Sequence, residues 1–318
     1  MMTVPQNIVL LSIVIRPNTP DDARRLTRGL EQLTCEDSTI QTRLLEDHVV
    51  LGGISEEQLE IVIDRLKRDF HVNAGLGKPE VSYREAITRT ADAEVKHVRQ
   101  TDGRGEYAQV KIRLHPGDLG TGYRFENRVT GGAIPAQFIE SVDRGIQDRL
   151  THGVVAGYPV EDVRVVLDDG SYHDVDSSEA AFRTAGFLAA EEGLRRGNPV
   201  LLEPVMDLEV VVPADYGREI TNDLVARRGH IQSVEHEGET KIIRAVVPLA
   251  GLFGYAIDLR TRTLGRGTRS MQFHSYMPYR SGDDERDDSL VGAPVRPRPR
   301  PRSSAVSLPE PDEEGGMH

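Results

Sequence analysis

A dense run of polar side chains, residues 168–179, offers the first candidate for chemistry. His173, Asp174 and Asp176 are of the types that hold a metal ion or take part in hydrolysis. The local pattern favours another interpretation, because an Asp-Gly turn signal follows an apolar strand and polar residues able to cap a helix come next. We therefore expect a strand–loop–helix connection with no metal and no catalytic residue. That interpretation leaves His173 unexplained at the apex of the loop.

A second polar loop, residues 99–107, lies between two segments with strand character. Its Asp-Gly pair and second glycine are typical of a β-hairpin. The candidate contact residues in it are Arg99, Gln100, Gly103, Arg104 and Gly105. The hairpin alone would account for the glycines, but arginine, glutamine and glycine together can also approach an RNA backbone or its bases closely.

Nucleotide-binding signatures are missing from these 318 residues. A phosphate-binding loop needs a glycine-rich turn ending in Gly-Lys-Ser/Thr, whereas Pro79 follows the Gly77-Lys78 pair. The Gly120-x-Gly122 pair lies between strands, so a dinucleotide-binding fold is also a poor match. We expect no cofactor and no enzymatic activity on this chain.

Composition narrows the class of protein further. The net charge of -12 disfavours a generic nucleic-acid coat, so any RNA contact must use local basic loops, and no DNA partner is expected. No apolar run is long enough to span a bilayer. The single cysteine, Cys35, cannot form an intramolecular disulfide, which agrees with a reducing compartment. A cytoplasmic protein without a membrane partner is the expectation.

Hydrophobic periodicity predicts an α+β protein. Residues 8–72 alternate as β-α-β-β-α-β, the order of a ferredoxin-like unit, and the last strand is expected to begin over 70–72. Residues 201–275 repeat that order, starting with a strand over 208–212 and ending with a helix over 251–263 and a strand over 268–274. Between them, four strands, a helix over 135–150, a strand over 163–167 and a helix over 177–195 indicate a separate α+β domain. The expected division of the chain is 1–80, 81–198, 199–280 and 281–318.

The last of these segments, residues 281–318, combines an Arg-Pro repeat with acidic stretches. It has too little apolar surface to offset the entropy of ordering, so we expect a disordered tail. The Arg-Pro repeat favours an extended polyproline conformation, which could serve a protein partner.

Several strings together resemble the motifs of elongation factor G, in the same order and over residues 5–276. They are GKPEVSYREAI (77–87), GRGEYAQV (103–110), GYRFENRVTGGAIP (122–135), SYHDVDSSEAAF (171–182), PVLLEPVMDLEV (199–210), RRGHI (227–231) and PLAGLFGYAIDLRTRTLGRGTRSMQF (248–273). Any one string is modest evidence, whereas the series is specific to that family.

The resemblance implies two ferredoxin-like domains, III and V, flanking a ribosomal-protein-like α+β domain IV. In that family, the tip of domain IV enters the ribosomal A site during tRNA–mRNA translocation. The tip loops correspond to residues 99–107 and 169–176, and the family's tip histidine corresponds to His173. Domain V faces ribosomal RNA, a contact for which the candidates are Arg260, Arg262, Arg266 and Arg269. An equally supported interpretation is that these arginines lie on a solvent-exposed helix face and contact no RNA.

The same resemblance implies partners and leaves alternatives open. The partners are the ribosome, with its rRNA and A-site tRNA–mRNA, and a separate chain that carries the GTPase domains. GTP would be bound only by that separate chain. The domain III helix-start motif departs from the family's Gly-Met-Gly-Glu-Leu-His-Leu, because residues 52–59 read GGISEEQL. The alternatives are a stand-alone ribosome-binding regulator, recycling or protection factor, and a protein-interaction module that does not bind ribosomes.

Overall fold

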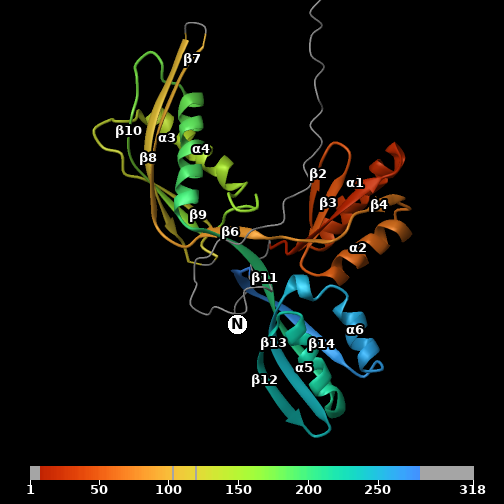
Figure 1. Cartoon of the computed structure of the whole chain (residues 1–318). Helices are drawn as coiled ribbons and strands as arrows, with labels where there is room; N and C mark the ends of the chain where they lie inside the picture. Colours follow the sequence, from red (N-terminus) through yellow and green to blue (C-terminus); the bar gives the residue numbers. More distant parts are fainter. Residues whose placement is uncertain (1–7, 102–103, 119, 280–318) are drawn as a thin grey trace, which may run out of the picture.

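The computed structural model describes residues 8–101, 104–118 and 120–279. It contains three antiparallel or mixed sheets, each with two α-helices on one face (Figure 1). We call the three parts the N-terminal unit (8–81), the central unit (91–196) and the C-terminal unit (199–279). The α+β class predicted from the sequence is confirmed, whereas the predicted tail, 281–318, lies outside the described residues.

The N-terminal unit has the strand order β2-β3-β1-β4 expected of a ferredoxin-like fold. Its elements are β1 (Leu11–Pro17), α1 (Pro20–Glu36), β2 (Gln41–Leu44), β3 (Val49–Gly53), α2 (Glu56–Arg68), β4 (Ala74–Leu76) and β5 (Glu80–Val81). Thr19 and Ser55 cap the two helices, and each side chain accepts a backbone N–H from the first turn. Leucines at helical spacing, including Leu26, Leu30 and Leu33, bury one face of α1 against the sheet.

The C-terminal unit repeats this order as β12-β13-β11-β14. Its elements are β11 (Pro199–Pro213), α5 (Gly217–Ala226), β12 (His230–Glu237), β13 (Thr240–Pro248), α6 (Tyr255–Arg262) and β14 (Thr268–Pro278). The helix predicted over 251–263 is shorter than expected, because a 3₁₀ turn (Leu249–Gly251) comes first and Gly254 adopts a left-handed conformation (φ 68°) before α6. The strand predicted over 208–212 begins much earlier, since β6 and β14 both pair with its first half.

The central unit carries a four-stranded sheet in the order β7-β8-β10-β9, with α3 and α4 packed on one face. Its elements are β7 (Ala91–Thr101), β8 (Arg104–Pro116), β9 (Tyr123–Asn127), α3 (Ala136–Leu150), β10 (Val163–Ser171) and α4 (Glu179–Arg196). The two helices approach so closely that a Cβ at Gly145 or Gly186 would collide with the backbone of the other helix. Phe138 and Phe182 stack between them at 4.9 Å.

A short strand, β6 (Arg84–Ile87), joins the central unit to the C-terminal unit by pairing with β11. Glu85, fully buried, lies on this strand. Its carboxylate accepts backbone N–H groups from Val155, Ala156, Gly157 and Tyr158, at 2.7 to 3.2 Å. Because a buried charge is costly unless it is fully hydrogen-bonded, this contact holds the loop after α3 firmly against β6.

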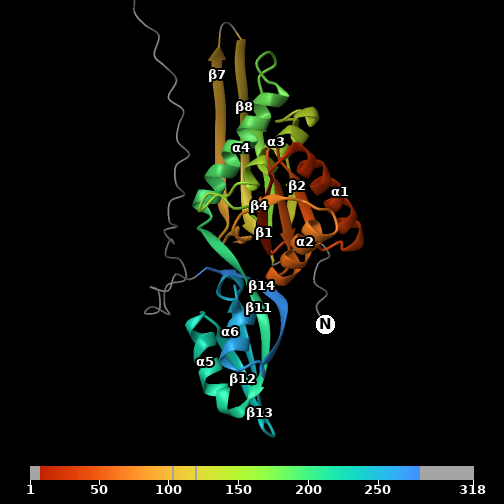
Figure 2. The same ribbon diagram turned by 90° about the vertical axis from the view of Figure 1, so that its right-hand side faces the viewer.

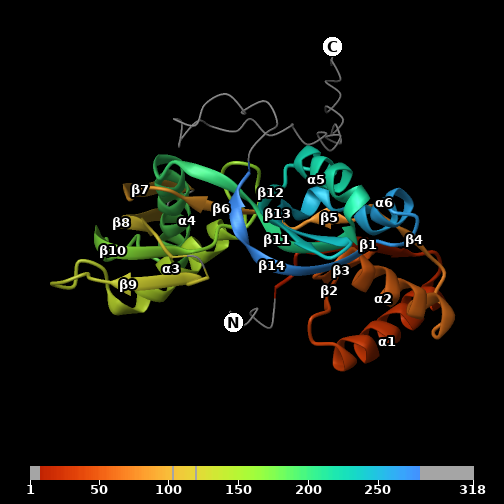
Figure 3. The ribbon, with the colours of Figure 1, turned by 90° about the horizontal axis from the view of Figure 1, so that it is seen from below.

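The N-terminal and C-terminal units share one apolar cluster, which includes Leu11 and Leu252. Two acidic residues at the start of α2 add polar contacts across the boundary. Glu57 forms an ion pair with Arg269, and Glu56 accepts the N–H of Gly254 at 2.9 Å. Figure 3 shows the central unit on one side of β11 and the N-terminal unit on the other.

The molecule is elongated. Figure 2 shows the β7–β8 hairpin and the loop before α4 at one end, and the β12–β13 hairpin at the other. None of the helices in the described residues is long and apolar enough to cross a bilayer.

Candidate functional site

The two polar loops predicted from the sequence lie side by side at the free end of the central unit. The N–H of Tyr107, on β8, donates to the carbonyl of Asp176 at 2.8 Å. The hydroxyl of Ser177 returns the contact by donating to the carbonyl of Tyr107 at 2.7 Å. Because β7 and β8 form one long hairpin, this pair of hydrogen bonds fixes the second loop to a rigid strand rather than to another loop.

His173 is half-exposed and forms the centre of the second loop, which we call the tip loop (residues 172–177). Its backbone N–H donates to the Ser177 hydroxyl at 2.9 Å, and its Nδ1 lies 3.1 Å from a carboxylate oxygen of Asp176. The backbone N–H groups of Val175 and Asp176 also point at Nδ1, at 3.4 and 3.3 Å. The contacts of the ring itself all engage Nδ1, so Nε2 is the ring nitrogen left to contact a ligand.

Gly105 is needed where the two loops meet. A Cβ at this position would lie 2.6 Å from the Asp176 carboxyl group, closer than real side-chain contacts allow. The glycine predicted as a hairpin residue therefore also permits close packing of the tip loop on β8.

The apolar and aromatic part of this surface was not predicted from the sequence. Val175 is 83% exposed at the apex, and Tyr172 and Val98 are also exposed. Tyr107 lies behind His173 with the ring centroids 6.3 Å apart, and the ammonium of Lys96 lies 5.3 Å from the Tyr107 ring centre. Exposed aromatic and aliphatic groups beside a histidine suit contact with nucleotide bases and sugars.

The remaining tip candidates fall in different places. Arg99 and Gln100 lie near the end of β7, where they pair with Glu106 and Gly105. Asp174 lies in the tip loop, two residues before Asp176. Gly103 lies outside the described residues, as does the side chain of Arg104. Within the described part of the chain, no group of three His, Cys, Asp or Glu side chains could hold a metal ion.

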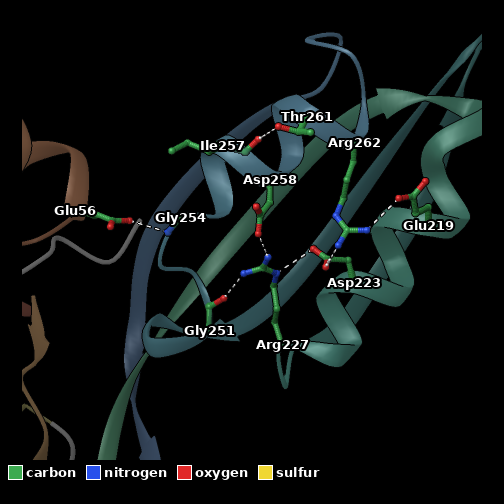
Figure 4. Close-up of polar contacts among 10 residues, drawn as sticks. All are labelled: Glu56, Glu219, Asp223, Arg227, Gly251, Gly254, Ile257, Asp258, Thr261 and Arg262. Atoms are coloured by element: carbon green, nitrogen blue, oxygen red, sulfur yellow. Dashed lines mark hydrogen bonds and ion pairs between the residues drawn. The ribbon is translucent and has the colours of Figure 1, made fainter. Parts of the chain in front are cut away.

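The four arginines predicted to act together on the C-terminal unit are separated by their partners. Arg262 contacts Glu219 and Asp223 on α5 (Figure 4). Arg266 lies over the Tyr216 ring, 4.9 Å from its centre. Arg269 turns to the N-terminal unit, and burial lowers its pKa. Of the four, Arg260 alone has no side-chain partner among the described residues.

An arginine that the sequence argument left aside organises this region. Arg227 donates to Asp223 at 2.9 Å, to Asp258 at 2.5 Å and to the carbonyl of Gly251 at 2.8 Å, and so ties α5 to α6 (Figure 4). Beyond this network, Ile257 and Leu264 are exposed to 71% and 76%. The free surface around Arg260 is therefore mixed, apolar and cationic, rather than a continuous basic stripe.

Comparison with known proteins gives a consistent assignment along the chain. The models of Elongation Factor G, domain III, of Elongation factor G, domain IV, and of Elongation factor G C-terminus match residues 4–78, 79–198 and 200–286. A crystal structure of a protein from Thermus thermophilus is 34% identical, with a TM-score of 0.66 over 90% of this chain. This chain covers 43% of that protein, less than half of its length. The chain belongs to the elongation factor G family, of which it carries domains III and IV and the C-terminal domain.

Proposed function

We propose that this chain is a ribosome-binding module in which the tip loop and the β7–β8 hairpin enter the A site and support tRNA–mRNA translocation. The observation that carries the proposal is the pair of hydrogen bonds between Tyr107 and residues 176–177, which presents His173 on a rigid strand end. In this position the ring can donate from Nε2 to a phosphate or ribose hydroxyl group. The module then acts by occupying space and holding RNA, without covalent chemistry.

Coupling to GTP would come from a separate chain with the GTPase domains. A groove in the N-terminal unit supports such docking, since α1 and α2 leave Leu33, Ile40 and Val62 at its base and the largely exposed Ile61 at its edge. Arg65 and Asp37 supply charges at the rim. We place the protein in the cytoplasm, where ribosomes are available, and expect that it binds no cofactor itself.

A stand-alone regulator, recycling factor or protection factor would use the same tip without a GTPase partner. A protein-interaction module would instead bind a protein partner and would not bind ribosomes. Sedimentation with 70S ribosomes in the presence and absence of GTP and of a candidate GTPase chain separates these three functions. Binding without either addition favours the regulator, and failure to bind under any condition removes the proposal.

The tip assignment is tested with His173→Ala. We expect ribosome binding to weaken about two- to twelvefold, the effect of losing one hydrogen bond worth roughly 0.5–1.5 kcal/mol. His152→Ala, which removes an exposed histidine at the far end of α3, is the matched control. Equal affinities for the two variants, measured by co-sedimentation, would contradict the assignment of the tip.

A further inference from the structure

The sheet of the central unit has one face that no helix of the described part of the chain covers. Its inner face carries the buried residues Ile112, Leu114, Val163 and Val165, which pack against α3 and α4. Since side chains alternate along a strand, the residues between them point to the opposite face. That outer face is mostly polar over β8, β10 and β9, and exposed in the described structure at Arg124 and Arg128.

Three basic residues on neighbouring strands form a straight line across this outer face. Arg164 on β10 is directly opposite His115 on β8 and directly opposite Arg124 on β9. We call these three residues the basic row. With strands about 4.8 Å apart, the row spans roughly 10 Å. It lies near the base of the central unit, about 34 Å along β8 from Gly105 at the tip.

Like charges on adjacent strands destabilise a sheet, so a basic row is an unfavourable choice for a face that only contacts water. Internal partners neutralise it incompletely. Glu126 is shared, at 3.3 Å from Arg164 and 2.8 Å from Arg128. Arg124 has no ion-pair partner among the described residues, and the His115 ring forms a hydrogen bond with the hydroxyl of Thr90, at 3.2 Å.

The lowered pKa of His115 is consistent with an excess of positive charge around it. Burial first, and then the positive charges of Arg164, Arg113 and Arg128, lower the pKa of His115. Arg113 is itself held by Asp92 and Asp168, at 2.7 and 3.4 Å, so the uncompensated charge lies toward β9. This positive region stands out on a chain whose net charge is -12.

We propose that the basic row, with Arg128 beside it, binds the sugar–phosphate backbone of ribosomal RNA. Arg124 and Arg164 are cations on neighbouring strands of a flat sheet, with His115 in line as a further hydrogen-bonding group, an arrangement that matches a linear polyanion. The planar guanidinium group pairs with phosphate through two hydrogen bonds. The row would bind without reading sequence, because it contacts phosphate rather than base edges. This inference rests on the proposed function, to which it adds a second RNA contact at the base of the unit that carries the tip.

The test compares Arg124→Gln and Arg124→Gln/Arg164→Gln with wild type for binding to 70S ribosomes at several salt concentrations. Loss of two phosphate contacts should weaken binding about tenfold and reduce the slope of log K against log salt by roughly 1.5. Arg144→Gln, which removes an exposed arginine from the helical face, should leave the slope unchanged. Row variants that behave like this control would overturn the inference.

Two further measurements separate the row from the tip and from folding. Thermal unfolding of Arg124→Gln should occur at the wild-type temperature or above, because repulsion between the arginines is relieved. A lower unfolding temperature would mean that the row is structural, against the inference.

A benzophenone side chain at Lys111, exposed on the outer face, should cross-link to rRNA, and cross-linking to a ribosomal protein would overturn the assignment. If His173→Ala weakens binding and the row variants do not, the proposed function stands alone. If the wild type never binds, both proposals fail.

Discussion

His173 and Gly105 depend on each other through one carboxylate, that of Asp176. The carboxylate lies 3.1 Å from the histidine Nδ1 and occupies the space that a side chain at position 105 would need. The orientation of the histidine therefore depends on the packing of Asp176 against Gly105 of β8, and the hairpin and the tip loop form one structural element.

This dependence predicts the effect of Gly105→Ala. The new methyl group should displace the Asp176 carboxylate, cost about 1 kcal/mol through overpacking, and speed amide hydrogen exchange at Tyr107. Asp176→Ala in the same chain makes room for the methyl group. We expect the double variant to recover slow exchange at Tyr107, measured by mass spectrometry or NMR, but not the orientation of His173. Slow exchange in Gly105→Ala itself would show that the contact is loose.

At the scale of elements, α1 is anchored at its start by Asp22, which is almost fully buried. Its carboxylate accepts the Thr19 hydroxyl at 2.6 Å and the N–H of Asn73 at 3.0 Å, so it joins the helix to the segment before β4. The Thr19 hydroxyl, and next the Asn73 N–H, lower the pKa of Asp22 below its ordinary value of 3.8.

A lowered carboxylate pKa means that the ionised form stabilises the fold. The contribution is present above pH 3.8 and is lost as the pH falls through the lower pKa of the folded state. Asp22→Asn should therefore be less stable than wild type at pH 7, and the difference should shrink below pH 3.8. Urea unfolding across this range measures it. The exposed neighbour Asp21 supplies the control, Asp21→Asn, for which we expect little change.

The helices, the strands and the α+β fold class were largely predictable from the sequence. Leucine spacing, the helix caps Thr19 and Ser55, and turn glycines are local signals that do not depend on tertiary contacts. The full length of β11 was not, since its first half is a strand only through pairing with β6 and β14. The start of the strand after α2 was also wrong: His71 adopts a positive φ of 52°, and β4 begins at Ala74.

The geometry of the candidate site was predictable in part. His173 and the hairpin glycines carried a family motif, whereas the roles of Tyr107 and Asp176 depend on a contact between residues about seventy positions apart. The arginine cluster could not be judged from charge alone. Whether Arg262 or Arg269 is available to a ligand depends on where Glu219 and Glu57 lie in space.

At the scale of the whole molecule, the contact between the N-terminal and C-terminal units depends on charge as well as on apolar packing. Glu57→Gln should weaken the ion pair with Arg269 and let the two units change their relative orientation. The exposed Cys35 on α1 and a cysteine placed at the exposed Gln232 on β12 provide sites for spin labels. We expect a broader distance distribution in Glu57→Gln.

Exchanging the charges of Glu57 and Arg269 tests whether their ion pair sets the orientation of the two units. Glu57→Arg with Arg269→Glu should restore a narrow distribution, since the pair is re-formed with reversed sign. Glu60→Gln, an exposed position on the same helix, should not change it. If all variants keep the wild-type distribution, the apolar cluster that the two units share, which includes Leu11 and Leu252, suffices to orient them.

The continuous strand β11 has a mechanical consequence. It pairs with β6 at the base of the central unit and, through the same fifteen residues, with β13 and β14 in the C-terminal unit. A twisting load that reaches the base of the central unit would therefore pass to the far end of the C-terminal unit as torsion of one continuous hydrogen-bonded strand.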